Sequence, residues 1–509
     1  MGLSAEQGHQ APGAAHPWAM AGRPPPGHPD GPAQVWRGIP YSTPPVGERR
    51  FGLPSAPPSW EEAGGLSQFA EPCIQLAPRG ISLPESTPGG SEDCLYLNVW
   101  SPSGPDARLP VLVWFHGGQF LFGSGNNFSG AALAARIDVV VVTVNYRLGP
   151  WGFSPPYLPS ARGSIYPNLG LLDQVAALRW VQANVSQLGG DPGRVTIAGQ
   201  GSGATSVLSL LAMPIAQRLF DQAALLSPQM VSSSQKLEAS APSFADALGV
   251  DIRRVSSALR SFPNTSITQA ASALISAPPS RPGWRPEIFA PWVDGKVLAF
   301  DPMASITEGN AAGVPLLVAT CAREASLQAA VDPSSAEACE AGLRRNIGDV
   351  AWHALSGVYR KAAEDGNWRI SILTDGLYRL PAIRIAERQA AAGGAAWLLT
   401  FDHHTRVPPL DRIGACHGSE LPFLWSDPTR RDASYFPGLD SPHDVWVATT
   451  LQSVLAGFAH TGRPGSALNV PWNPYTVEDR SVLRLGPGAE LEHDPAPERR
   501  QSWNGLRFP

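Results

Sequence analysis

The sequence predicts an α/β fold in which a mostly parallel, twisted sheet carries helices on both faces. Short apolar runs recur along the 509 residues, segments of helical length separate several of them, and 43% of the residues are hydrophobic whereas only 16% are charged. Strands that alternate with helices favour parallel pairing through crossover connections. Strands that are apolar at every position fit burial on both faces of a sheet.

The predicted strands are the apolar runs of strand length. The clearest is VVVVTV, which begins at Val139. A continuous run this short, with no helical periodicity, is typical of a buried strand. The seven predicted strands are 95–100, 111–115, 139–145, 194–198, 223–226, 316–319 and 397–401.

Four longer segments are predicted helices, at 169–187, 203–211, 375–391 and 443–460. The first 34 residues are rich in Gly, Pro, Ala and His, and we expect residues 1–34 to be a disordered tail. No repeat or linker divides the remainder, so 35–509 is predicted to be a single domain.

Composition excludes several classes of function. The net charge of -5 is mild for this length and calls for neither nucleic acid nor an anionic membrane. No apolar run reaches the ~18 residues of a membrane-spanning helix. The sequence has no C-x-x-C pair, and the adjacent His403 and His404 lack further ligands at useful spacing and are expected to be a surface pair. We therefore expect no metal and no cofactor.

The stretch GQGSGATSV, which begins at Gly199, follows a predicted strand and opens a predicted helix. Some hydrolases place a serine nucleophile at such a turn, in the pattern G-x-S-x-G. In one frame Gly199 and Gly203 flank Gly201, which has no side chain to attack a carbonyl. In the other frame Ser202 is central, and Gln200 would bring bulk into the turn.

Seven motifs occur in order: GIPYSTPPVGERRF, SEDCLYLNVW, WFHGGQF, VVVTVNYRLGPWGF, NLGLLDQVAALRWVQANVSQLGGDPGRVTIAG, CHGSELPF and GFAHTGRPG. On these motifs the chain resembles the type-B carboxylesterase/cholinesterase family over roughly residues 35–485. The resemblance implies an α/β-hydrolase fold and, in an intact member, hydrolysis of carboxylic esters by a Ser-Glu-His triad.

The resemblance implies roles for four residues of that triad and its turn. It places Gly201 at the nucleophile position and gives the backbone N–H of Ser202 to the oxyanion hole, with the Ser202 hydroxyl as an alternative nucleophile. His417 corresponds to the catalytic histidine and Glu324 to the acid that orients it. The family usually has Asp-Glu-Gly around that acid, whereas this chain has Arg-Glu-Ala at 323–325, which puts a cation beside the acid.

The segment HGGQF corresponds to the family's oxyanion loop, whose N–H groups face the negative oxygen of a tetrahedral intermediate. It assigns Gly117, Gly118 and Gln119 to the oxyanion hole together with Ser202. Gln119 stands where a glycine or alanine is usual, and its long side chain is expected to fill part of the acyl site.

The resemblance also bears on the cysteines and on compartment. It implies a disulfide between Cys73 and Cys94, and two free buried thiols are the alternative; the pairing of Cys321, Cys339 and Cys416 stays open. Members are mostly secreted or luminal, which would make the sequons at Asn127, Asn184 and Asn264 glycosylation sites. The first 34 residues contain no signal peptide, so a cytoplasmic location is the alternative.

Four residues resemble buried ion pairs of the family, namely Arg50 with Glu92 and Arg147 with Asp173. The substrate pocket should be apolar. Its candidate lining residues, which could equally belong to the core, are Trp114, Phe120, Phe122 and Trp425.

Two hypotheses about function follow. In the first, the chain is inactive or very weak as an esterase and acts as a binding module, for an apolar ester, another hydrophobic small molecule or a protein partner. Neuroligin-like members also carry glycine at the nucleophile position. In the second, it hydrolyses carboxylic esters through Ser202 or through a water held by His417.

Overall fold

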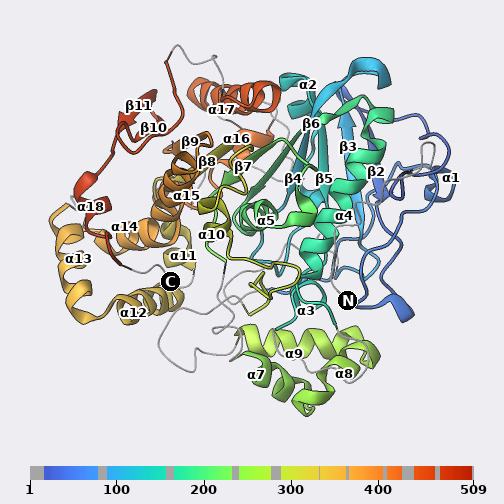
Figure 1. The fold of residues 1–509 in the computed structure, drawn as a ribbon, viewed down its shortest axis with the longest axis horizontal. Coiled ribbons are helices and arrows are strands. Elements are labelled where there is room, and N and C mark those ends of the chain that lie inside the picture. Colours follow the sequence, from blue (N-terminus) through green and yellow to red (C-terminus); the bar gives the residue numbers. More distant parts are fainter. Residues whose placement is uncertain are drawn as a thin grey trace.

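The computed structural model describes residues 16–77, 89–155, 165–231, 240–276, 288–331, 333–362, 366–404, 410–426, 439, 441–464 and 470–506. One 11-stranded sheet runs through the molecule, from the red strands at one edge to the blue strands at the other (Figure 1). The spatial order is β1-β2-β3-β5-β4-β6-β7-β8-β9-β10-β11. The strands are β1 (His28–Asp30), β2 (Ala33–Pro40), β3 (Tyr96–Ser101), β4 (Leu109–Phe115), β5 (Val140–Val144), β6 (Gly190–Gln200), β7 (Gln222–Leu226), β8 (Leu316–Cys321), β9 (Ala396–Phe401), β10 (Ser481–Leu485) and β11 (Ala489–His493).

The centre of the sheet is parallel and its edges are antiparallel. The strands β5, β4, β6, β7, β8, β9 and β10 pair in parallel with their neighbours. The β1–β2, β2–β3, β3–β5 and β10–β11 pairs are antiparallel. The predicted fold class, a mostly parallel sheet with helices around it, is confirmed, and all seven predicted strands are present.

The central strands are apolar at every position because they are buried on both faces. In β4, Val111, Val113 and Phe115 belong to the larger core cluster, whereas Leu112 and Trp114 belong to the smaller one. Alternate side chains of a strand point to opposite faces, so these two clusters are the two sides of the sheet.

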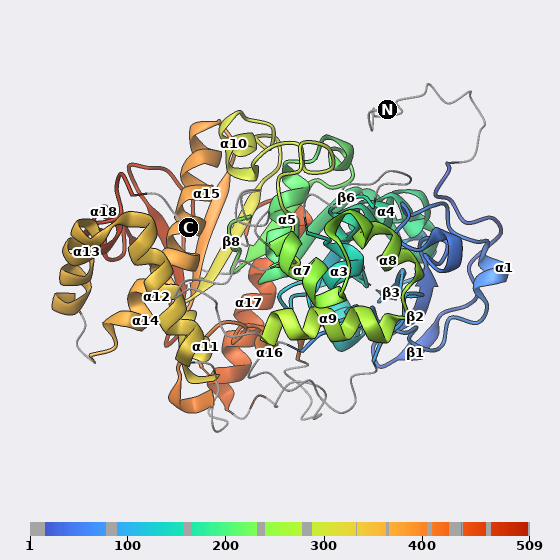
Figure 2. The same cartoon turned by 90° about the horizontal axis from the view of Figure 1, so that it is seen from below.

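Helices cover both sides (Figure 2). Apolar residues of α4, α5 and α15 join the larger cluster, and those of α2, α16 and α17 join the smaller one. The helices are α1 (Trp60–Ala63), α2 (Ala131–Ile137), α3 (Gly149–Gly152), α4 (Leu169–Asn184), α5 (Ser202–Leu211), α7 (Ser240–Leu248), α8 (Val255–Ser261), α9 (Asn264–Ser276), α10 (Pro302–Thr307), α11 (Ala325–Val331), α12 (Pro333–Ile347), α13 (Asp349–Ala362), α14 (Trp368–Thr374), α15 (Leu380–Ala391), α16 (Leu421–Trp425), α17 (Pro442–Thr461) and α18 (Pro497–Gln501).

The predicted helices are present with shifted ends. The segment 169–187 becomes α4 followed by the 3₁₀ turn Val185–Leu188, and 203–211 becomes α5. The segment 375–391 begins with a π-helical turn, Asp375–Arg379, which joins α14 to α15. The segment 443–460 is α17, whose Ser441 and Asp444 form a capping box at its start.

The expected disordered tail over 1–34 is wrong for its second half, and residues 1–15 lie outside the described residues. Strand β1 pairs with β2 within this segment. Met20 is buried, and its N–H donates to Asn184 Oδ1 at 2.8 Å. An apolar side chain and a backbone donor thus anchor the segment to α4, although its composition carries no such signal.

The two expected ion pairs are formed. Arg147 Nη2 lies 2.7 Å from Asp173 Oδ1, and both side chains are almost fully buried. Arg50 Nε lies 2.7 Å from Glu92 Oε2 nearer the surface. Among the described residues, no helix combines the length and apolar character needed to cross a membrane.

Candidate active site

The carboxyl ends of the parallel strands position the candidate site, which is where open α/β sheets place their ligands. Strand β6 ends at Gln200 and α5 begins at Ser202, so a single residue makes the turn. That residue, Gly201, has φ 57° and ψ −120°. This conformation is costly for a residue with a side chain and easy for glycine.

Packing requires glycine on both sides of the turn. A Cβ atom on Gly199 would lie 2.4 Å from the Gly203 carbonyl carbon, and one on Gly203 would lie 2.0 Å from the Phe115 carbonyl oxygen. Either contact could be relieved only by moving the backbone, because both partners are backbone atoms. The spacing of Gly199 and Gly203 therefore sets Gly201 at the tip of the turn.

His417 faces that tip. A Cβ atom on Gly201 would lie 2.9 Å from His417 Nε2 and 3.4 Å from its Cε1. The opposite nitrogen, Nδ1, donates to Glu324 Oε2 at 2.7 Å. The His417 side chain is 28% exposed and that of Glu324 is fully buried. The structure thus brings together Gly201, His417 and Glu324 in the order in which a triad acts.

Glu324 is held by further donors. Its Oε1 accepts from Ser227 Oγ at 2.5 Å and from the Cys321 N–H at 2.8 Å. The neighbouring Arg323 carries its side chain toward Gly414, where a Cβ atom would lie 2.7 Å from Arg323 Cδ. The cation next to the acid therefore leaves the Glu324–His417 contact intact.

Gln200 is a site residue that the sequence analysis treated only as bulk in the turn. Its side chain is buried, and its Nε2 lies 3.2 Å from His417 Nε2. Glu324 accepts the hydrogen on Nδ1, which leaves Nε2 of the neutral ring as an acceptor. The Gln200 amide then donates to the nitrogen that a triad would use as its base. No motif signals this contact, because it joins residues 217 positions apart.

The Ser202 hydroxyl faces the loop after β4. Its Oγ accepts from the Phe120 N–H at 3.3 Å and lies within hydrogen-bonding reach of Tyr146. The hydroxyl therefore ties the start of α5 to the loop that follows β4. The structure does not bring the Ser202 hydroxyl to His417, which is bonded to Gln200 and Glu324.

The loop after β4 carries the predicted oxyanion residues. Gly118 has φ 113°, and a Cβ atom there would lie 2.1 Å from the Phe122 carbonyl oxygen. Gln119 has φ 56° and an exposed side chain, and its filling of part of an acyl site stays a prediction. Among the described residues, the N–H groups of Gly118 and Gln119 have no acceptor.

A neutral histidine supports this loop. Burial lowers the pKa of His116 to about 4, and its Nδ1 donates to the Gly117 carbonyl at 2.8 Å. Its ring stacks on Tyr146 at 4.4 Å, and the Tyr146 hydroxyl donates to the His116 carbonyl at 2.7 Å. The His116 and Tyr146 contacts therefore hold the backbone of this loop in place without a ligand.

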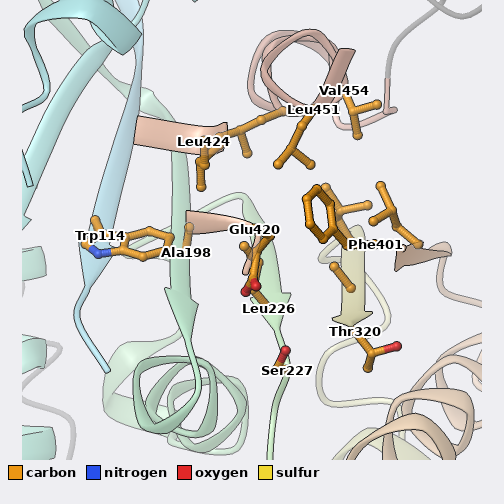
Figure 3. Close-up of a pocket in the computed structure, with 14 residues that line it drawn as sticks. Trp114, Ala198, Leu226, Ser227, Thr320, Phe401, Glu420, Leu424, Leu451 and Val454 are labelled. Atoms are coloured by element: carbon orange, nitrogen blue, oxygen red, sulfur yellow. The ribbon is translucent and has the colours of Figure 1, made fainter. Parts of the chain in front are cut away.

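An apolar cavity of about 30 Å³ lies on the side of the smaller core cluster, and its lining includes Ser227, which donates to Glu324. Figure 3 shows Glu420 within its lining, among Leu226, Leu424 and Phe401. Of the expected pocket aromatics, Trp114 lines this cavity and packs against Trp425 at 5.1 Å. Both rings therefore lie in the core, on the opposite side of the sheet from α5.

The other two candidate pocket aromatics lie on the α5 side. Phe120 is fully buried and packs against Phe153 at 4.8 Å, and Phe122 is half-buried. Phe120 therefore belongs to the larger core cluster.

Glu420 has an unusual environment. Its Oε2 accepts from Cys321 Sγ at 3.0 Å, and its Oε1 has no partner among the described residues. Burial raises the pKa of the Glu420 carboxyl above its ordinary value, and the charge of Glu324 is the second cause.

Glu420→Gln is expected to stabilise the protein increasingly as pH rises above the ordinary carboxyl pKa of 4.5. Below the ordinary carboxyl pKa of 4.5 both folded and unfolded Glu420 are protonated. Above this pKa, the Glu420 carboxyl ionises in the unfolded chain before it ionises in the folded protein. The free energy of unfolding of the wild type therefore falls until the pH passes the folded-state pKa, whereas the variant has no carboxyl at this position and shows no such fall. Urea unfolding across this range measures the difference. The exposed Glu478→Gln variant is the control, and a pH-independent difference at Glu420 would contradict its raised pKa.

The expected disulfide is not formed in this structure, where Cys73 and Cys94 are both buried free thiols. The two thiols are close enough to form a hydrogen bond. This bond is the largest cause of the raised pKa of the Cys94 thiol, and burial is the second. The disulfide stays a prediction.

The sequon asparagine Asn184 is fully buried. Its amide accepts from Met20 and donates to the carbonyls of Trp18 and Trp180, so a glycan there is incompatible with the fold.

His403 is not the surface residue we expected. Its Nε2 lies 2.7 Å from Asp444 Oδ1, and its side chain is half-buried, whereas His404 is exposed. Within the described ranges, no group of three or more His, Cys, Asp or Glu side chains is placed to hold a metal ion.

Comparison with known proteins gives consistent matches. A profile of the Carboxylesterase family matches residues 23–503. The para-nitrobenzyl esterase of Bacillus subtilis (strain 168) is 36% identical over 474 residues, which cover 92% of this chain and 94% of that protein. A carboxylesterase structure from Geobacillus stearothermophilus aligns with a TM-score of 0.80 at 34% identity, over 94% of this chain and 98% of that one. Neuroligin-2 of Mus musculus is 28% identical over 90% of this chain and 62% of its own length.

Proposed function

Because the chain belongs to the carboxylesterase family, we propose that it is a member with glycine at the nucleophile position, inactive or very weak as an esterase, that acts by binding. The observation that carries the proposal is the position of Gly201. A side chain there would start 2.9 Å from His417 Nε2. Gly201 supplies no oxygen at that place, so no acyl-enzyme can form.

The size of the loss follows from the chemistry. Removal of the nucleophile from a serine hydrolase lowers kcat by on the order of 10⁶, which corresponds to about 8 kcal/mol of barrier. An oxyanion hole and a binding pocket alone retain roughly 10³ over water. The retained Glu324–His417 contact and the free N–H groups of the loop therefore support binding far better than turnover.

A second candidate is a slow carboxylic-ester hydrolase. The His417 ring, oriented by Glu324 at 2.7 Å, favours it, because an oriented imidazole can act as the base that activates a water. The names of relatives such as the para-nitrobenzyl esterase also favour it. A route through Ser202 has less support, since its hydroxyl bonds to the oxyanion loop.

A fluorophosphonate probe tests the proposal on the wild-type protein. Such probes react covalently with activated serines, and we expect no labelling. Gly201→Ser serves as the positive control and Ser202→Ala as the variant that identifies the alternative nucleophile. Labelling of the wild type that disappears in Ser202→Ala would reject the proposal in favour of a working serine at 202.

An apolar ester, another hydrophobic small molecule or a protein partner are the proposed classes, and the similarity to neuroligin-2 is what supports a protein partner.

A further inference from the structure

The Gln200 side chain lies between the loop after β4 and the segment that carries His417. A Cβ atom on Gly117 would lie 3.1 Å from Gln200 Oε1, and one on Gly418 would lie 3.8 Å from Gln200 Nε2. The absence of a side chain at Gly117 therefore leaves room for this amide. Gln200 is only 5% exposed, so protein atoms rather than solvent surround its amide.

The amide reaches the nitrogen that a triad would use as its base. Gln200 Nε2 lies 3.2 Å from His417 Nε2, whereas the opposite ring nitrogen bonds to Glu324 at 2.7 Å. With its hydrogen on Nδ1, the ring offers Nε2 as its one acceptor. An sp² nitrogen has a single lone pair and accepts one hydrogen. While Gln200 donates to it, neither a water nor a hydroxyl group can pass a proton to His417.

The contact is built on a fixed backbone. Gln200 is the last residue of β6, and it pairs with Leu226 of the neighbouring strand β7. If the buried amide released His417, its N–H would lose a partner that solvent cannot easily replace. The sheet and the burial of the amide therefore both favour the contact over its release.

We propose that Gln200 is an inhibitory positioning residue, which keeps the base of this site occupied. The inference rests on the proposed function, because it explains why the retained Glu324–His417 contact does not by itself make a working base. It separates two causes of low activity. The missing hydroxyl acts at residue 201, whereas the occupied base acts through residue 200 and persists when a hydroxyl is restored.

The test restores a nucleophile and then removes the amide. Gln200→Met keeps an unbranched side chain of similar length that cannot donate a hydrogen bond. We expect Gly201→Ser combined with Gln200→Met to hydrolyse p-nitrophenyl acetate at least tenfold faster than Gly201→Ser alone. The gain should appear in kcat and not in KM, because a free base acts at the chemical step.

The matched control is Gln501→Met, at the exposed end of α18, which should leave the Gly201→Ser rate unchanged. A gain below tenfold from Gln200→Met, or two folded proteins that are both inert, would overturn the inference.

A second measurement needs no catalysis. Gln200→Glu puts a carboxylate where the amide now faces His417 Nε2, and a negative charge at such a distance favours the protonated imidazole. Glu324 and Glu420 are the same in both proteins. We expect the NMR titration midpoint of His417 to rise by at least about one pH unit, and that of the exposed His353 to stay in place. An unchanged midpoint at His417 in the folded variant would show that residue 200 does not reach the ring.

The inference and the proposed function fail in different experiments. Fluorophosphonate labelling of the wild type would reject the proposed function, and the ratio of the two Gly201→Ser rates would still measure the effect of Gln200. An unlabelled wild type together with a ratio near one would reject the inference alone.

Discussion

Gly201→Ser is expected to create an esterase that hydrolyses p-nitrophenyl acetate at least ~10³-fold faster than the wild type. The full deficit of a missing nucleophile is on the order of 10⁶, and two features of the site limit recovery. A Cβ atom at 201 lies 2.9 Å from His417 Nε2, so the ring must withdraw by a few tenths of an ångström. The Gln200 amide also competes with the new hydroxyl for the same nitrogen.

The matched control is Gly201→Ala, which adds the same Cβ without an oxygen. It separates the effect of the nucleophile from that of crowding. His417→Ala combined with Gly201→Ser should return the rate to that of Gly201→Ala, because the serine then has no base. If Gly201→Ser folds and yet hydrolyses no faster than Gly201→Ala, the oxyanion loop or the Glu324–His417 contact does not support acyl transfer.

Asp173→Asn is expected to lower the free energy of unfolding by about 3–5 kcal/mol, as removal of one partner of a buried ion pair does. Arg147 donates to this carboxylate through Nε at 2.8 Å, Nη2 at 2.7 Å and its backbone N–H at 3.1 Å. The two side chains are 3% and 0% exposed, so water cannot replace the lost charge. Urea unfolding followed by tryptophan fluorescence measures the change.

The same substitution at an exposed pair provides the control. Asp251 contacts Arg253 at 2.8 Å, but the side chains are 47% and 79% exposed. Solvent screens such pairs, so Asp251→Asn should leave the unfolding midpoint where the wild type has it. Equal effects of the two substitutions would mean that Asp173 contributes no more than a surface charge.

The sequence predicts the central sheet well because burial on both faces leaves a continuous apolar signal. It misses β1, β2, β10 and β11, which lie at or near the sheet edges. In β11 every residue is half-buried or exposed, so no apolar run marks it. The segment 16–34 escapes prediction for a related reason. Its attachment depends on a few contacts such as Met20 with Asn184, which composition does not reveal.

The candidate site divides in the same way. Gly199, Gly201 and Gly203 could be singled out because turns and close backbone contacts impose residue types locally. His417 and Glu324 could be named through the resemblance to a family. The role of Gln200 could not, since its contact with His417 depends on how the turn after β6 faces a loop far along the chain.

By itself, the sequence determined a mostly parallel sheet and a glycine at the tip of the turn after β6, because both leave local marks in residue type. Only the tertiary structure decided that His417 faces that glycine, that the Ser202 hydroxyl bonds to the loop after β4 and that Glu420 is buried next to Cys321. Such contacts depend on distance and burial between segments that are remote in the chain, and these appear only once the chain is packed.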